Sequence, residues 1–417
     1  MSKAALTRDT PFARNYAREV LLLERGRGCT VWDSNGRSYL DFGSGIAVNA
    51  LGYGDRRLAR AVARQMRRLV HISNLYATPQ ALELGRRMLE SAAGVARTPM
   101  GGVHFGNSGA EANEAAIKYA RLYAYATRGS GHYRIVSLSD GFHGRTMGAL
   151  SATPKQAYRT RFEPLVPGFE TVPFDDPVAL ERISDQDSAA IIVEVVQGEG
   201  GLRRLGPDMV RVLNRITERG AAGEAVPLVI ADEIQTGFGR LGTLYGSETV
   251  GLQPDIISLS KPLAGGLPMS ATLIPERVNA QVQPGDHGTT FGGGPAVSAA
   301  ALYVLDRIAD AGFLQRVRER AAELETGLQT LAERYPWVSE LRGAGMLRGL
   351  RIDLGAEQDT LYPQMIDAAR DQGLLILRSG SDVIRIAPPL VISSRDLRRG
   401  LERLEATFAH IEARRAT

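Results

Sequence analysis

Cysteine is nearly absent from this chain: Cys29 is the single cysteine among 417 residues. One cysteine excludes an intrachain disulfide and a metal site made of several thiolates, and it is typical of proteins from a reducing compartment. The sequence also lacks an apolar leader region at its start and any apolar run of membrane-spanning length. We therefore expect a soluble, cytoplasmic protein with no membrane partner.

A strong charge of either sign is missing as well. Lysine and arginine number 50 against 46 aspartates and glutamates, which gives a net charge of +4 with no block of like charges. The most basic stretch, RRLARAVARQMRR at residues 56–68, repeats apolar residues at every fourth position, as an amphipathic surface helix does. The six histidines include no H-x-x-x-H pair. We expect neither nucleic-acid binding nor a metal site.

Apolar residues are plentiful, at 44% of the chain, and predict large cores in two or three domains. Several apolar runs are continuous rather than alternating, which is typical of strands buried on both faces of a mainly parallel sheet. These runs are YRIVSL, AAIIVEVV, PLVIAD and DIISLS. The expected fold class is α/β: a large domain with a mainly parallel sheet flanked by helices, plus a smaller α+β domain.

The domain boundaries are predicted from a change in the sequence near residue 306. Beyond it, long charged helices at 313–335 and 394–414 flank the short strands MLRGLRI, LLILR and VIRIAP. We expect residues 51–305 to form the large domain and residues 306–417 the small domain. The N-terminal segment 1–50, with a hairpin turn at its Ser-Asn-Gly, is expected to join the small domain.

One lysine stands in an unusual place. SLSKPLAGGLPMSA puts Lys261 directly after a predicted buried strand and follows it with prolines and glycines. An exposed lysine is the ordinary interpretation, since most lysines face water. The Gly/Pro-rich loop instead favours close backbone approach to a ligand, at the strand end where α/β sheets collect ligands. A Ser-x-x-Lys acylase pair with Ser258 is disfavoured, because that pair needs a helix.

A carboxylate and a phosphate-binding turn follow other predicted strands. VIADEIQTGFGR ends a strand at Asp232, which is either a helix cap or an acid brought beside Lys261 at one sheet edge. The strand-to-helix turn GNSGAEANEAA presents free backbone N–H groups and a helix dipole, so it is able to hold a phosphate.

Four more side chains have a feature suited to a ring or an anion. Phe142 offers a flat face for stacking, and Arg145 offers a fork for a carboxylate. Glu199 lies in a glycine-rich loop after a buried strand. Arg385 sits between apolar residues of a strand, which is costly unless an anion meets it. His143, in the same loop as Phe142, is not expected to bind metal.

Taken together, these stretches resemble the class III aminotransferases of fold type I, which use pyridoxal phosphate. Within that family they are most similar to the acetylornithine and ornithine aminotransferases. The matching stretches follow the family order over nearly the whole chain, and ADEIQTGFGRLG with SLSKPLAGGLPMSA is the most specific pair. The others include NSGAEANEAAIKYAR, GFHGRT, VVQGEGG, HGTTFGGGPA and VIRIAPPLVI.

The resemblance implies a role for each candidate residue. Lys261 would form the internal aldimine with pyridoxal 5′-phosphate, Asp232 would keep the pyridine nitrogen protonated, and Gln235 would lie near the ring oxygen. The resemblance also implies a homodimer with active sites shared between subunits. The other cofactor contacts implied are Phe142 on the ring face, Ser108, Gly109 and Ala110 at the phosphate, and Thr290 from the second subunit.

For substrates, the resemblance implies two carboxylate forks, Arg145 and Arg385, with Thr289 also in contact. Glu199 would neutralise Arg385 for an ω-amino substrate and move away for a 2-oxo acid, as an acid in a flexible glycine-rich loop can. The implied reaction moves the amino group of an ornithine-like ω-amine, free or N-acetylated, to 2-oxoglutarate.

Departures from the family pattern keep alternatives open. Ala110 replaces a threonine of the phosphate turn, Tyr53 and Asp55 replace two histidines of an entry loop, and Gly294 replaces an asparagine. These changes leave the cofactor chemistry intact but alter the surroundings of the substrate. One alternative is decarboxylation, amino-group migration, or γ-elimination and bond formation with the same cofactor. The other is a non-catalytic binding protein, which the lysine and aspartate pair disfavours.

Overall fold

The computed structural model describes residues 12–16, 21–184 and 187–415. The first eleven residues, where the sequence predicts no leader, lie outside the described residues. A seven-stranded sheet in the order β4-β10-β9-β8-β7-β5-β6 forms the centre of the larger part of the molecule. Its strands are β4 (Met100–Gly106), β5 (Arg134–Leu138), β6 (Phe169–Val172), β7 (Ser188–Val193), β8 (Leu228–Asp232), β9 (Ile256–Leu259) and β10 (Ser270–Pro275).

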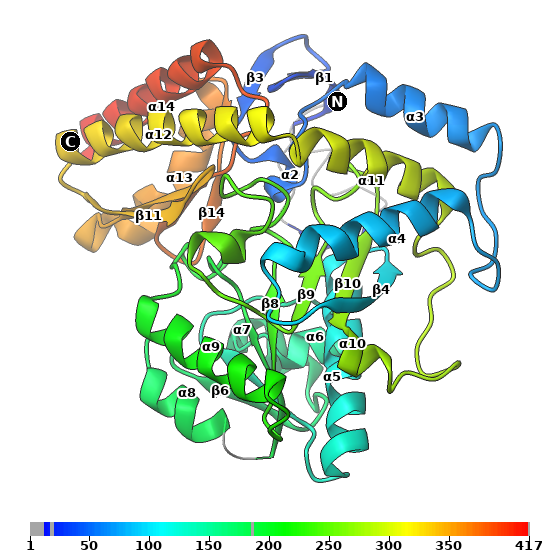
Figure 1. Ribbon diagram of the computed structural model, residues 1–417. Helices are drawn as coiled ribbons and strands as arrows, with labels where there is room; N and C mark the ends of the chain where they lie inside the picture. Colours follow the sequence, from blue (N-terminus) through cyan, green and yellow to red (C-terminus); the bar gives the residue numbers. More distant parts are fainter. Residues whose placement is uncertain (1–11, 17–20, 185–186, 416–417) are drawn as a thin grey trace.

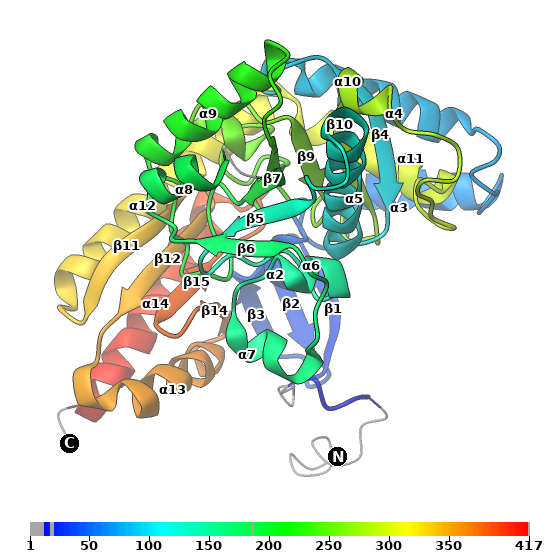
Figure 2. The same ribbon diagram turned by 90° about the horizontal axis from the view of Figure 1, so that it is seen from below.

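This sheet is mainly parallel, which confirms the predicted fold class. β10 runs antiparallel to β9 and β4, whereas the pairs from β9 through β8, β7 and β5 to β6 are parallel. Helix α5 (Gly109–Arg128) covers one face, and α8 (Pro177–Ser184) with α9 (Pro207–Ala221) covers the other (Figure 2). Because both faces are covered, every residue of β7, β8, β9 and β10 is buried, and their sequences are mainly apolar instead of alternating.

Alternate residues of these strands supply two separate cores. In β8, Leu228 and Ile230 pack with the alanines of α5. Val229 and Ala231 of the same strand pack with Leu213 and its neighbours on α9. Because successive side chains point to opposite faces of the sheet, one strand packs against the helices on both sides.

The rest of the chain builds two smaller sheets. One has the order β1-β2-β3-β13, so that the N-terminal strands pair with a strand near the C-terminus. The other, β11-β12-β15-β14, is antiparallel. The strands are β1 (Leu23–Arg27), β2 (Thr30–Asp33), β3 (Ser38–Asp41), β11 (Val338–Ala344), β12 (Leu347–Ile352), β13 (Leu374–Leu375), β14 (Leu377–Ser379) and β15 (Val383–Ile386).

The single strand predicted over LLILR is wrong. Leu374 and Leu375 pair with β3, whereas Leu377 to Ser379 pair with β15 in the other sheet. The chain therefore leaves one sheet and enters the next within this stretch. An apolar run records burial, and it does not record which sheet supplies the hydrogen-bond partners.

In Figure 1 the orange and red small part lies beside the cyan and green large part, with α12 along its upper side. We propose residues 51–305 as the large domain, and 306–417 with the N-terminal segment as the small domain; α11 ends three residues beyond that second boundary. The remaining helices are α2 (Ser44–Ala47), α3 (Arg56–Met66), α4 (Pro79–Ser91), α6 (Met147–Ser151), α7 (Gln156–Arg159), α10 (Glu276–Asn279), α11 (Pro295–Ile308), α12 (Ala311–Arg334), α13 (Gln358–Asp371) and α14 (Ser394–Arg415).

Candidate active site

Two neighbouring strands of the large sheet bring an acid and an amine to one edge. β8 and β9 are parallel, and Asp232 at the end of β8 pairs with Ser258 of β9. Three residues later the chain reaches Lys261, so both side chains meet at the carboxyl edge of the sheet. A cavity of about 390 Å³ opens there. Its lining includes eight of the predicted site residues: Ser108, Gly109, Ala110, Phe142, Arg145, Asp232, Gln235 and Lys261.

Lys261 is half-buried and faces this cavity. Burial, with the nearby Arg385 cation, lowers the pKa of Lys261 to about 8, although Glu199 and Asp232 act in the opposite direction. A substantial fraction of this amine is therefore neutral near physiological pH. The loop beyond it is folded back, because the Ser260 hydroxyl donates to the carbonyl of Met269 at 2.9 Å.

Asp232 is held by a buried hydrogen-bond network. One of its carboxylate oxygens, Oδ2, accepts from Asn113 Nδ2 and meets His143 Nδ1, both at 2.8 Å. The other oxygen accepts from the backbone N–H of Ile234 at 3.1 Å. Asn113 is itself fixed, since its amide oxygen accepts from the Ser258 hydroxyl at 2.7 Å. The carboxylate therefore has one orientation relative to the cavity.

Burial acts to lower the pKa of His143, but the hydrogen bond and charge of Asp232 outweigh it and raise that pKa. His143 thus acts as a donor to the carboxylate through Nδ1. Within the described residues, no three His, Cys, Asp or Glu side chains come together as a metal site would require.

The N-terminus of α5 forms the opposite wall. Ser108 caps the helix, and its hydroxyl accepts from the N–H of Glu111 at 3.3 Å. A Cβ on Gly109 would lie 2.8 Å from the Ile234 side chain, so glycine lets the helix begin this close to the end of β8. The first N–H groups of the helix, at Gly109 and Ala110, have no intrahelical acceptor, and both residues line the cavity, so these groups are available to an anion there.

Phe142 and Arg145 lie on a loop whose backbone is held in place by the buried carboxylate of Glu194. Glu194 accepts the backbone N–H of Phe142 at 3.0 Å and that of Gly198 at 3.1 Å. Burial raises the pKa of Glu194 to about 7, while the His143 ring opposes that change. The Arg145 guanidinium lies over the ring of Tyr158, with its Cζ 3.5 Å from the ring centroid.

Arg385 does not line this cavity, because Glu199 pairs with it. The buried guanidinium donates through Nη1 to Glu199 Oε1 at 2.6 Å and to the Gly198 carbonyl at 2.9 Å. Nη1 also lies 3.5 Å from Gln235 Oε1, which places the pair directly behind the cavity wall. Any external carboxylate that reaches Arg385 has to replace the one from Glu199.

Thr289 and Thr290 also lie outside this cavity. The Thr289 hydroxyl accepts from Asn107 Nδ2 at 3.4 Å, next to the cap of α5. Thr290 is exposed and lines a separate cavity of about 690 Å³ on the outer side of the same region. Neither threonine is brought to the Lys261 cavity within its own chain.

Comparison with known proteins decides the family. Residues 12–408 match the model of Aminotransferase class-III. The chain belongs to the class III aminotransferases. It is 43% identical to an acetylornithine aminotransferase from Thermosynechococcus vestitus over 97% of both chains. The structure superposes on an ornithine aminotransferase from Toxoplasma gondii with a TM-score of 0.89 at 30% identity, covering 98% of this chain and 94% of that one.

An N-acetylornithine aminotransferase structure from Stenotrophomonas maltophilia is also similar, with a TM-score of 0.81 at 31% identity, covering 95% of this chain and 98% of that one. The T. gondii structure is described as partly occupied by PLP at its active site. Class III aminotransferases depend on this cofactor, so this chain is a PLP-dependent transaminase. Across the described residues, no helix is both long enough and apolar enough to cross a membrane.

Several residues of the site were not predicted from the sequence. Asn113 lies on the buried side of α5, where a polar residue in an alanine-rich helix gives no sign of its partner. Tyr158 lies in the short helix α7, whose sequence gives no sign of a contact with Arg145. Glu194 did leave a signal, because it is a lone acid within the apolar run AAIIVEVV. A charged group inside such an apolar run is costly to bury unless hydrogen bonds or an opposite charge compensate for it.

Proposed function

We propose that this transaminase moves the amino group of an ornithine-like ω-amine, free or N-acetylated, to 2-oxoglutarate. The observation that carries the proposal is the Glu199–Arg385 pair at 2.6 Å behind the Lys261 cavity. A donor that presents its ω-amine has no carboxylate near the reacting amine, so the closed pair accepts it without leaving a buried charge alone. 2-Oxoglutarate carries a second carboxylate, which can take the place of Glu199. The names of the relatives support the same substrate class.

The residues of the cavity suit pyridoxal phosphate. The phosphate has the free N–H groups of α5 and the Ser108 hydroxyl available, although Ala110 supplies no hydroxyl. Asp232 provides a fixed acceptor for the ring nitrogen, and Phe142 a flat face for the ring. Gln235 is within the same lining, and we assign it to the ring oxygen. We assign these residues to the cofactor on that complementarity.

When bound, PLP would supply an electron sink for the charge that develops at the substrate carbon carrying the reacting amine. The chain contributes the groups that bind, orient and move protons. Lys261 would hold the cofactor through its neutral amine, which its lowered pKa makes available. With the cofactor transferred to the substrate amine, Lys261 Nζ would be free to act as a general base towards the proton on the carbon that carries the reacting amine.

Asp232 would hold the ring nitrogen of the cofactor in its protonated form. Its own orientation is set by Asn113 and His143. Arg145 is assigned to the substrate α-carboxylate, since its guanidinium lines the cavity and rests on Tyr158. Thr289 is assigned a supporting contact through Asn107.

We infer a homodimer in which Thr290 reaches the phosphate of the other subunit. Thr290 is exposed and lies outside the Lys261 cavity of its own chain. Beside it, Phe291 is 65% exposed, and the segment between α3 and α4 exposes Leu75 at 90% and Tyr76 at 68%. Apolar side chains that are this open favour a protein partner. A second copy of the chain would cover them and supply the threonine.

A cytoplasmic location is proposed on the chemistry of Cys29. This single cysteine is buried, and burial raises the pKa of its thiol to about 12. A buried thiol of this kind is unreactive, and a single cysteine, which excludes an intrachain disulfide, is typical of a reducing compartment.

The test is to mix the purified holoenzyme separately with ornithine, N-acetylornithine, 4-aminobutyrate and glutamate, without keto acid. We expect the visible absorbance of the cofactor to be converted to that of its aminated form by glutamate and by at least one of the two ornithine compounds. If no amine in a broad panel converts the cofactor, the proposed half-reactions do not occur in this enzyme.

A further inference from the structure

The backbone around Glu199 is fixed on both sides, in contrast to the flexible loop expected from its glycines. The carbonyl of Gly198 accepts from the Ser379 hydroxyl at 2.8 Å, and that of Glu199 accepts from the N–H of Gly380 at 3.0 Å. The N–H of Gly201 donates to Ser379 Oγ at 3.0 Å. The Glu199 carboxylate can therefore leave its arginine only by rotating about its own side-chain bonds.

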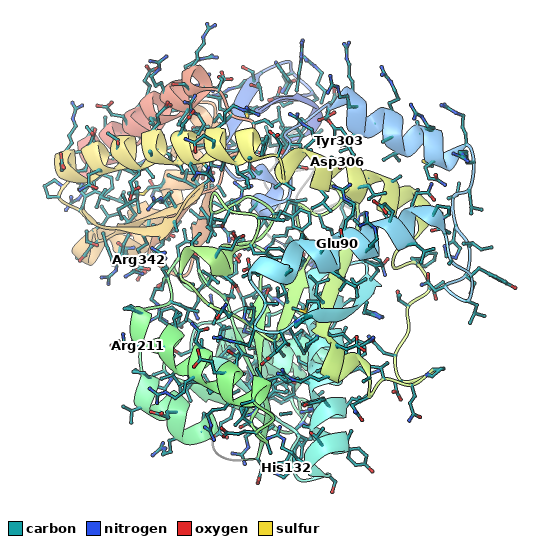
Figure 3. The ribbon with its side chains drawn as sticks, viewed as in Figure 1. Glu90, His132, Arg211, Tyr303, Asp306 and Arg342 are labelled. Carbon is teal, nitrogen blue, oxygen red and sulfur yellow. The ribbon has the colours of Figure 1, made fainter. Side chains whose placement is uncertain are left out.

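Space for the rotated carboxylate is available in a neighbouring cavity. Glu199 also lines a second cavity, of about 360 Å³. Its wall carries four cations: Lys155, Arg203 and two arginines of the small domain, Arg342 and Arg351. Figure 3 places Arg342 on the side of the small domain that faces the large domain. The cavity thus lies at the junction of the two parts, next to the carboxylate that has to move.

Three of these four cations already have a carboxylate partner. The pairs, at N–O distances of 2.6 to 2.9 Å, are Arg203–Asp140, Arg342–Glu340 and Arg351–Asp382. Lys155 differs from them: its contact is with the ring of Tyr158, 4.9 Å from Nζ to the centroid. Over the residues that the structure describes, no carboxylate pairs with it. The cavity therefore has one positive charge in excess when Glu199 is on Arg385.

We propose that the Glu199 carboxylate moves into this cavity when a dicarboxylate takes Arg385, and that Lys155 is the positioning residue that holds it there. The inference rests on the proposed function, since it requires Arg385 to bind a substrate carboxylate. Arg385 then has a carboxylate partner in both states, and Lys155 gains one only when Glu199 has moved. With an ω-amine bound, Arg385 pairs with Glu199; with 2-oxoglutarate or glutamate bound, Arg385 pairs with the substrate and Lys155 pairs with Glu199.

The consequence is tighter binding of dicarboxylates, caused by a residue that lies outside the Lys261 cavity. Lys155 lies just before α7 and does not line that cavity. Loss of the Lys155 charge should make it less favourable for Glu199 to leave Arg385. It should not change the state in which Glu199 and Arg385 are paired. A partly exposed ion pair contributes up to roughly 1 kcal/mol, so we expect an effect of about fivefold on dicarboxylate binding.

Lys155→Met in the holoenzyme tests this, with Lys155→Arg as the matched variant that keeps the charge. The first readout is binding of glutarate, a five-carbon dicarboxylate that cannot react, measured by calorimetry. We expect the Kd to rise about fivefold in Lys155→Met and to stay within about twofold in Lys155→Arg. The second readout is the split between half-reactions: glutamate should show a raised KM, whereas ornithine should be unaffected.

Two outcomes overturn the proposal. If Lys155→Met weakens neither glutarate nor glutamate, or weakens both half-reactions equally, Lys155 does not hold the moved carboxylate. Arg385→Ala separates this from failure of the proposed function. If Arg385→Ala selectively impairs glutamate while Lys155→Met does not, only the position assigned to Glu199 is wrong. If Arg385→Ala impairs both substrates equally, the exchange at Arg385 is wrong, and both proposals fail together.

Discussion

An ordinary lysine has a pKa near 10.4 and is almost wholly protonated at neutral pH. In this protein burial and Arg385 lower the pKa of Lys261 to about 8. Only the neutral amine attacks an aldehyde, so the rate at which apoprotein takes up PLP should rise with pH through a midpoint near 8. The measurement is the rate of appearance of cofactor absorbance in stopped flow. A rate that is still climbing tenfold per pH unit above pH 9 would show an unshifted lysine.

Asn113 gives a second prediction at the level of single residues. Asn113→Leu keeps the branched shape of the side chain but removes the N–H donated to Asp232 and to the His143 carbonyl, and it leaves the buried Ser258 hydroxyl without its nearer acceptor, the Asn113 amide oxygen. Unsatisfied buried groups should lower the free energy of unfolding by about 1 to 3 kcal/mol, and PLP should bind more weakly. Urea unfolding of the apoprotein and a cofactor titration measure the two effects.

Ser258→Ala is the milder control, since it removes only the outer link of the network. It should cost about 1 kcal/mol, with little change in PLP affinity. Equal stability and affinity in Asn113→Leu and the parent protein would contradict the role given to this network.

Single residues were predictable where a strand end positions them. Lys261 and Asp232 follow apolar runs, so their meeting at one sheet edge followed from the sequence pattern. The polar network behind them was not predictable. Asn113 meets Asp232 across 119 residues of sequence, and periodicity carries no record of such a contact. Its partner became visible only once α5 was packed on the sheet.

At the scale of elements, the start of α5 both caps a helix and provides the anion site. Ser108→Ala removes the cap and should destabilise the apoprotein by about 0.5 to 2 kcal/mol. It also removes a hydroxyl proposed to bind phosphate, so PLP affinity should fall beyond what the loss of stability explains. Thermal unfolding of apoprotein and holoprotein measures both. A holoprotein that loses no more stability than the apoprotein would remove Ser108 from the cofactor site.

Elements were predicted well where one signal dominated. The long helices and buried strands of the large sheet appear at the expected places, since length and continuous apolarity are unambiguous there. LLILR failed because its two halves belong to different sheets. The Glu199 loop was expected to be mobile from its glycines, yet Ser379 and Gly380, far away in sequence, fix its backbone.

At the scale of the whole molecule, the proposed dimer predicts an effect of surface charge. Phe291→Asp places a carboxylate in the apolar surface around Phe291, Leu75 and Tyr76. Because burying an unpaired charge is costly, we expect the mass in solution to fall from about twice the 45.0 kDa chain towards one chain. PLP should be lost in parallel, since Thr290 would no longer reach the other subunit. Analytical ultracentrifugation and cofactor absorbance follow the two changes.

Val178→Asp is the matched control. Val178 is 74% exposed and belongs to α8, on the other side of the molecule from the segment between α3 and α4 (Figure 1). This variant should keep the mass and cofactor content of the parent protein. A Phe291→Asp protein that stays at its original mass and retains PLP would contradict the proposed interface.

The central claim is that Lys261 carries the cofactor, and the chain makes it easy to test because it has four lysines: Lys3, Lys118, Lys155 and Lys261. Borohydride reduction of the holoprotein fixes the cofactor to its lysine, and mass spectrometry of the peptides then locates it. We expect the pyridoxyl group on Lys261 alone. A label on any of the other three lysines, or no label in protein loaded with PLP, would contradict the account.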